Sequence, residues 1–218
     1  KKLFQKQGVR WFHLGGIFTA LSESTAEVSA EAMETAKKAG TIVSYDLNFR
    51  SKLWSSEKAQ QITRPLVQYM DFVIGNEEDF QKVLGFEVEG VDEKLLELPV
   101  ENYKRMVGRL MESFAHLKGV GTTLREVVSG LINHWSAILY YDETFYESQR
   151  YENLEIEDRV GGGDGFSSGL IYGFLNGKPP AECVELGAAH GAILQSTRGD
   201  TSMITLDEVL HVMAGGTA

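Results

Sequence analysis

The chain has 218 residues, of which 43% are hydrophobic and 24% charged, with a formal net charge of -10 and a pI near 5.0. This length suits one large domain or two small ones, with enough core to bury roughly 70% of the unfolded surface. The acidic charge argues against a nucleic-acid partner, because a phosphate backbone requires a basic face. A polyanion such as ATP would need local devices: helix N-termini, a few Arg or Lys side chains and a metal ion.

Cysteine content and hydrophobic runs predict the cellular setting. Cys183 is the single cysteine, so no disulfide can form within the chain, and we predict a cytoplasmic protein. The sequence contains no run of about 18 apolar residues, so it predicts no membrane helix. The first ten residues, KKLFQKQGVR, are basic but have no apolar core of a signal peptide. They also lack an initiator Met and begin mid-pattern, so we expect the chain to be part of a longer protein.

Strands and helices are predicted in alternation along the first half. The capping box in STAE, the C-cap Gly40 and the helix-breaking Pro65 fix several boundaries. The expected elements are a strand at 9–18 that ends at Gly15-Gly16, a helix at 24–39, a buried strand at 41–47, an amphipathic helix at 56–69 interrupted at Pro65, a strand at 71–75, and a short helix from Asn76.

The second half continues this alternation and adds a hairpin. Residues 87–99 are acidic and irregular, which predicts a solvated insertion. The expected elements are a helix at 101–116, a strand at 117–124, a hairpin at 135–151 with its turn near Asp142-Glu143, a helix from the glycine run to Leu175, a helix from Pro179-Pro180 to about Ser196, and a capped turn at 205–210.

This order of elements is typical of βαβ units. It predicts an α/β fold in which a doubly wound, mainly parallel sheet carries helices on both faces, with right-handed crossovers. We expect residues 1–218 to form a single core domain. In such sheets ligands bind at the carboxyl ends of the strands, so functional residues are expected there.

The stretch DRVGGGDGFSSGL, residues 158–170, places three glycines at the start of a predicted helix. The first turn of a helix has unpaired N–H groups at the positive end of the dipole, and glycine lets an anion approach them. Gly161, Gly162 and Gly163 therefore suit an anion hole for a phosphoryl group. Asp164 at its rim could accept a proton from an attacking hydroxyl. The alternative is a flexible loop in which Asp164 is an ordinary N-cap.

Two common nucleotide motifs are absent from the sequence. There is no GxxxxGK[ST], which argues against a P-loop, and no GxGxxG after a strand, which argues against a Rossmann dinucleotide site.

Four motifs in order resemble the PfkB (ribokinase-like) sugar kinases. DRVGGGDGFSSGLIYGFL resembles the family's D-x-x-G-A-G-D signature, with Gly162 in place of the usual alanine. SYDLNFRSKLW (44–54) and TTLREV (122–127) resemble the 2-keto-3-deoxygluconate (KDG) kinase branch. GNEEDF (75–80) resembles the N-x-x-E element, with Asp79 in place of Glu.

The resemblance implies a role for each matched residue. Asp164 matches the catalytic base, and Gly161, Gly162 and Gly163 match the anion hole. The resemblance further implies three groups of contacts. Asp46, Asn48 and Arg50 would contact the substrate or a phosphate, and Thr122, Arg125 and Ala189 the nucleotide. Asn76 and Asp79 would hold a magnesium and phosphate network, partly through water.

Each of these roles has a structural alternative. Asp46 and Asn48 could bond their own backbone in a local turn. Asn76 is a favourable N-cap, and Arg125 could be a surface residue at a helix start. The small residues around Ala189 would leave room for a flat adenine ring, but small residues are also typical of tight helix packing.

The resemblance implies an ATP-dependent kinase that uses Mg²⁺ and phosphorylates the primary hydroxyl of KDG. It also allows a monovalent cation as a cofactor. The alternatives are another PfkB kinase, for fructose, ribose or a nucleoside, and a non-catalytic nucleotide-binding module. Family members begin with a sugar-binding segment and a β lid. We expect both to be missing here, and we expect a homodimer when the full chain is present.

Overall fold

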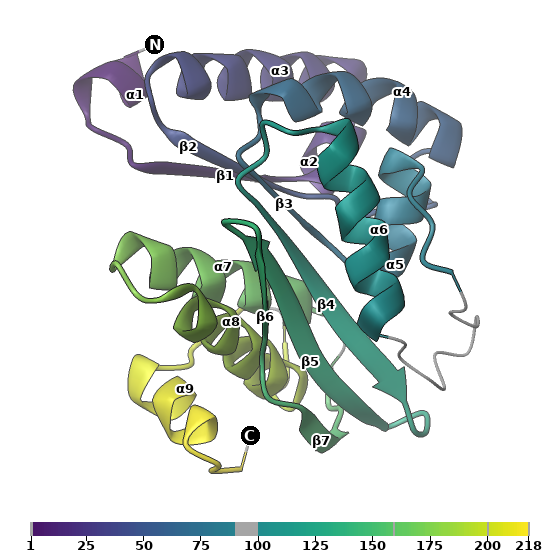
Figure 1. The fold of residues 1–218 in the computed structure, drawn as a ribbon, viewed down its shortest axis with the longest axis vertical. Helices are drawn as coiled ribbons and strands as arrows, with labels where there is room; N and C mark the ends of the chain where they lie inside the picture. Colours follow the sequence, from purple (N-terminus) through teal and green to yellow (C-terminus); the bar gives the residue numbers. More distant parts are fainter. Residues whose placement is uncertain (1, 90–99, 159, 200, 218) are drawn as a thin grey trace. The chain divides into compact units, whose positions relative to one another are not determined.

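The computed structural model describes residues 2–89, 100–158, 160–199 and 201–217, and in Figure 1 they are drawn as a ribbon. Most of the acidic insertion predicted at 87–99 lies outside these residues. The chain divides into two compact units, the first formed by residues 1–89 and 101–120 and the second by residues 90–100 and 121–218. Each unit is described by itself. The single domain expected over residues 1–218 stays a prediction.

The first unit is built on three parallel strands. Its strands are β1 (Trp11–Gly15), β2 (Ile42–Asp46) and β3 (Phe72–Gly75), in the order β1-β2-β3. Its helices are α1 (Lys2–Lys6), α2 (Gly16–Ala20), α3 (Glu23–Lys38), α4 (Ser56–Leu66), α5 (Glu77–Asp79) and α6 (Val100–Ser113). Parallel neighbouring strands need long crossover connections. Helices α2 and α3 connect β1 to β2, and α4 connects β2 to β3. Strand β2 is buried along most of its length, so the carboxyl ends of β2 and β3 are fixed by the core.

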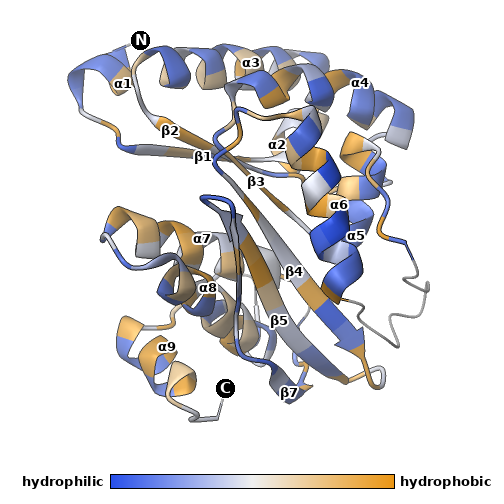
Figure 2. Ribbon diagram, viewed as in Figure 1, coloured by the Kyte–Doolittle hydropathy of each residue, from blue (hydrophilic) through white to orange (hydrophobic). Residues whose placement is uncertain are grey.

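The second unit combines antiparallel strands with a layer of helices. Its strands are β4 (Gly119–Val127, which begins in the first unit), β5 (Ile132–Tyr141), β6 (Thr144–Glu147) and β7 (Tyr151–Glu155). Both β6 and β7 pair with β5 in antiparallel register. Its helices are α7 (Gly162–Leu175), α8 (Pro180–Gln195) and α9 (Leu206–Met213). In Figure 1 these three helices stack together on one side of β5 and β6, and Figure 2 shows the hydrophobic colour of α7 mainly toward its C-terminal end.

The α/β class is confirmed, and parallel and antiparallel strands both occur. The predicted hairpin is also confirmed. Asp142 and Glu143 at its tip have φ of 49° and 59°, the left-handed values that a two-residue hairpin turn requires.

Several boundaries differ from the predictions for local reasons. Helix α2 was not expected, because its five residues are too few to show a helical period. Helix α3 is capped by Ser22 with Thr25, two residues earlier than STAE suggested. Pro65 lies inside α4, which ends one residue later and continues as a 3-10 turn at Val67–Tyr69.

Among the described residues, no helix has both the length and the apolar character needed to cross a membrane.

Candidate active site

The glycine run forms the N-terminal turn of α7. Gly161 is the N-cap, with φ of 92° and no side-chain capping bond, and the helix begins at Gly162. This left-handed conformation favours glycine. The first helical hydrogen bond runs from Gly165 N–H to Gly161 O at 2.7 Å. The interpretation of Asp164 as the N-cap is therefore wrong, because Asp164 is the third residue of the helix.

Asp164 is exposed, and its carboxylate makes no hydrogen bond or ion pair within the described part of the chain. Gly163 beside it is also exposed, whereas Gly162 is buried. A Cβ on Gly162 would lie 2.9 Å from Cγ of Gln195, so packing is a second reason for a small residue there. The turn thus presents a carboxylate without a protein partner beside helix N–H groups that have no intrahelical acceptor.

The DLNFR stretch follows β2 directly. Asp46 ends the strand and is only 6% exposed. Asn48 has φ of 36°, and Arg50 is exposed and donates to Phe49 O at 2.7 Å. The left-handed φ of Asn48 bends the backbone just after the strand, and a local turn in which Asp46 and Asn48 bond their own backbone stays a prediction. The exposed guanidinium at a strand's carboxyl end still has donors available for an anion.

Asn76 and Asp79 form a capping box at the start of α5. The Asn76 side chain accepts from Asp79 N–H at 2.9 Å, and Asp79 Oδ2 accepts from Asn76 N–H at 3.0 Å. Asp79 Oδ1 accepts from Phe49 N–H at 2.7 Å. Burial raises the pKa of Asp79, against the opposing effect of these two N–H donors.

Asp79 therefore joins two motifs of the first unit that are 30 residues apart in sequence. No sequence pattern indicated this contact, since neither motif specifies the distance between the β2 and β3 loops. A role for Asn76 and Asp79 in holding magnesium stays a prediction. Their side-chain oxygens accept hydrogen bonds from backbone N–H groups in this structure.

In the second unit, Thr122 and Arg125 both lie on β4. The strand predicted at 117–124 extends to Val127 in the structure. Arg125 therefore lies within a strand, and the alternative that placed it at a helix start is wrong. Thr122 Oγ1 is buried with no hydrogen-bond partner in the described residues. Arg125 is half-buried, and its guanidinium makes no hydrogen bond or ion pair with any described residue.

Ala189 lies in the middle of α8 with no exposed surface, like Ala188 and Ala192. The indole N–H of Trp135 donates to Ala188 O at 3.1 Å, and a Cβ on Gly191 would lie 3.1 Å from the same ring. Tight packing, the structural alternative, is thus what these small residues provide. Nucleotide binding by Ala189 stays a prediction.

The donor set can be compared with the ligands that an ATP-dependent enzyme needs. The α7 N-terminus, the free guanidinium of Arg125 and the unpaired Thr122 hydroxyl are suitable groups for phosphate oxygens. No group of three or more His, Cys, Asp or Glu side chains suitable for a metal occurs among the described residues.

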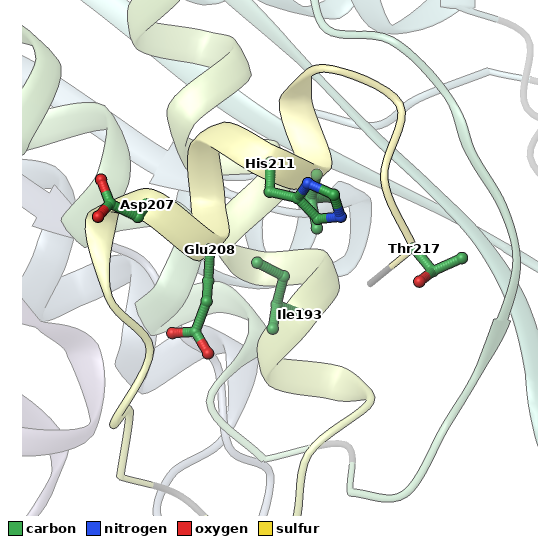
Figure 3. A pocket seen from close by; sticks show the side chains of 6 residues that line it. Ile193, Asp207, Glu208, His211 and Thr217 are labelled. Carbon is green, nitrogen blue, oxygen red and sulfur yellow. The ribbon is translucent and has the colours of Figure 1, made fainter.

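A separate cavity of about 380 Å³ lies beside α9 in the second unit (Figure 3). Its lining residues are Ile193, Asp207, Glu208, His211, Val212 and Thr217. None of them is a predicted site residue, so this cavity is not the predicted site.

Comparison with solved structures supports the fold. Over 97% of its length the chain is similar to 2-dehydro-3-deoxygluconokinase from Thermotoga maritima, with 36% identity and a TM-score of 0.88, and it covers 63% of that chain. The chain thus has the mixed, mainly parallel α/β fold of the ribokinase-like kinases.

Two curated relatives have related names. A 2-dehydro-3-deoxygalactonokinase from Haloferax volcanii is 30% identical over 95% of the chain. A 5-dehydro-2-deoxygluconokinase from Geobacillus thermodenitrificans is 28% identical over 88% of the chain. The chain covers 58% and 52% of these two proteins, so it spans little more than half their length.

The family model for pfkB family carbohydrate kinases matches residues 7–105 and 136–206, which include the β2 and β3 loops and the α7 turn. The chain therefore belongs to the pfkB family of carbohydrate kinases.

Proposed function

We propose that the protein transfers the γ-phosphoryl group of ATP to the primary hydroxyl of 2-keto-3-deoxygluconate. The observation that carries this proposal is the α7 turn, where an exposed carboxylate that has no partner among the described residues adjoins a glycine N-cap. Family membership supports a carbohydrate kinase. The names of the similar proteins, which include kinases of keto-deoxy sugar acids, support this substrate class.

Asp164 is the general base in this proposal. Its carboxylate takes the proton of the substrate's primary hydroxyl, and the oxygen attacks the γ-phosphorus while the bond to the ADP oxygen breaks. The N–H groups of Gly162, Gly163 and Asp164 stabilise negative charge on the phosphoryl oxygens, because they point along the helix axis at the N-terminus. Thr122 and Arg125 bind the nucleotide phosphates.

The acidic substrate needs a cation, and Arg50 is the proposed partner. Its exposed guanidinium can hold a carboxylate or a phosphate through two parallel hydrogen bonds. Asp46 and Asn48 are proposed to contact the substrate from the same loop. Mg²⁺ would neutralise phosphate charge, with Asn76 and Asp79 holding it through water. The whole protein is proposed to act in the cytoplasm, as a homodimer.

The test is an ADP-release assay on the full-length protein with Mg²⁺-ATP and a panel of sugars. The panel contains 2-keto-3-deoxygluconate, the keto-deoxy sugar acids in the names of the two curated relatives, fructose, ribose and a nucleoside. We expect the highest kcat/KM on 2-keto-3-deoxygluconate. Asp164→Asn should bind ATP almost unchanged and lower kcat by about 10²- to 10⁴-fold, the usual contribution of a general base.

Asp207→Asn is the matched control, because Asp207 is also an exposed carboxylate in the first turn of a helix. It should keep normal turnover. An Asp164→Asn protein that retains most of its kcat would exclude this base. Turnover on fructose, ribose or a nucleoside instead would support a kinase with a substrate other than 2-keto-3-deoxygluconate. Binding of ATP without turnover on any sugar would favour the non-catalytic module.

A further inference from the structure

A chain of side-chain hydrogen bonds crosses from the segment after α8 to the first turns of α7. His190 on α8 is at its centre: Nδ1 lies 3.0 Å from Ser168 Oγ, and Nε2 lies 2.7 Å from Ser202 Oγ. Ser168 Oγ donates to Gly165 O at 3.0 Å, and Ile204 N–H donates to Ser202 Oγ at 3.4 Å. No role proposed above uses these residues.

The donors and acceptors of this chain assign the histidine tautomer. The Ser168 proton is directed to Gly165 O, so Ser168 Oγ accepts from His190 Nδ1–H. Nε2 is then unprotonated and accepts from the Ser202 hydroxyl. Burial lowers the pKa of His190, which favours this neutral form at pH 7. Each hydroxyl and each ring nitrogen therefore has a defined partner.

The chain ends at the turn that carries Asp164. Ser168 is four residues after Asp164, so the two exposed side chains share one face of α7. At the same place the backbones of α7 and α8 meet, because a Cβ on Gly165 would lie 3.1 Å from Gly191 Cα. His190 precedes Gly191 and lies beside this crossing. Its ring thereby links the segment 202–204 to the first two turns of α7.

We propose that His190 is a positioning residue of the phosphotransfer site: its Nε2 anchors the segment 202–204 beside the α7 turn through Ser202, while Ser168 fixes the orientation of its ring. This inference rests on the proposed kinase function. All residues assigned to the nucleotide lie in the second unit with His190, whereas Asp46, Asn48 and Arg50 lie in the first. Loss of the link should therefore raise KM for ATP and leave KM for the sugar acid unchanged.

The two amide replacements of histidine separate the two halves of the link. In His190→Asn the amide group lies near the Nδ1 position and keeps only the Ser168 side. In His190→Gln it lies near the Nε2 position and can still accept from Ser202. In the full-length protein, His190→Asn and Ser202→Ala should raise KM for ATP by about fivefold, as expected for one net hydrogen bond. KM for the sugar acid should stay unchanged, and His190→Gln should stay within about twofold of the wild type.

Hydrogen exchange gives a second readout of the same link. Backbone amides of residues 201–205 should exchange faster in His190→Asn and Ser202→Ala, and at the wild-type rate in His190→Gln. His134→Gln is the matched control, since the His134 ring accepts a single bond, from Asn153 N–H at 3.0 Å, in the same unit. It should change neither KM for ATP nor exchange at 201–205.

Unchanged KM for ATP in both His190→Asn and Ser202→Ala would overturn the proposal. So would an equal effect in His190→Gln, because that result would indicate a general loss of packing. If the wild type phosphorylates no sugar, the proposed function fails instead. Calorimetric ATP affinities of the same variants then decide the positioning role: an about fivefold loss in His190→Asn and Ser202→Ala, but not in His190→Gln, supports it, and equal affinities overturn it.

Discussion

At Asp79, one buried carboxylate holds two loops in place. Its oxygens accept the N–H groups of Phe49 and Asn76, and only 6% of its surface is exposed. The loops contain Arg50 and Asn76, both assigned to the proposed site. Truncation of Asp79 would leave two partly buried N–H donors without their acceptor, which costs more than the net value of a hydrogen bond.

Asp79→Ala is therefore expected to lower the free energy of unfolding by about 2–3 kcal/mol, measured by urea denaturation. Glu78→Ala, at the exposed neighbouring position, should change it by less than about 0.5 kcal/mol. Equal stability of the two variants would contradict the structural role of Asp79. A rise in KM for Mg²⁺ in Asp79→Asn, with stability retained, would support the metal role.

At the scale of elements, α7 and α8 pack through glycines. A Cβ on Gly169 would lie 2.5 Å from Leu186 O and 2.8 Å from Gly187 Cα, both backbone atoms that cannot move aside cheaply. Further along, a Cβ on Gly173 would lie 2.8 Å from Cys183 Sγ. Burial raises the pKa of the Cys183 thiol to about 11, so this cysteine is a packing residue at neutral pH.

Gly169→Ala should destabilise the protein by about 1–3 kcal/mol through overpacking, although alanine is the better helix former. Gly108→Ala in α6 is the matched control, because a Cβ there has nothing within 4 Å. It should stabilise the protein by about 0.5–1 kcal/mol. Thermal unfolding of the two variants checks the opposite signs, and stabilisation by both would contradict the close approach of α7 and α8.

Sequence reasoning succeeded best for elements with local signals. The hairpin turn at Asp142-Glu143 and the helix after the glycine run were predicted where the structure has them. It failed where the signal was short or ambiguous. Helix α2 has too few residues to show a period, and the strand β7 was not predicted, since the predicted hairpin ended at its first residue, Tyr151. Neither prediction could use the neighbours that stabilise these segments.

At the scale of the whole molecule, Asp71 links stability to pH. It is 2% exposed, and its carboxylate lies 2.8 Å from Lys37 Nζ and 3.0 Å from Lys118 Nζ, while Val43 N–H donates to it at 3.0 Å. Burial acts to raise the pKa of Asp71, but these donors outweigh it and the pKa is lowered. A lowered pKa in the folded state stabilises the protein above the unfolded-state pKa of about 3.9, and this stabilisation is lost as the pH falls.

Asp71→Asn should therefore cost about 1–3 kcal/mol of unfolding free energy at pH 7, and the difference from the wild type should shrink below about pH 4. Urea denaturation over a pH series measures this change. Asp142→Asn at the exposed hairpin tip is the control, and its difference from the wild type should not shrink in the same way. A pH-independent cost of Asp71→Asn would contradict the linkage.

The sequence by itself determined the α/β class, the glycine N-terminus of α7 and the family, because these depend on local periodicity and on residues adjacent in the chain. The tertiary structure decided which motifs touch. The contact of Asp79 with Phe49 and the chain through Ser168, His190 and Ser202 join segments that are 12–30 residues apart. Such contacts depend on how strands and helices pack, and local sequence patterns do not specify that geometry.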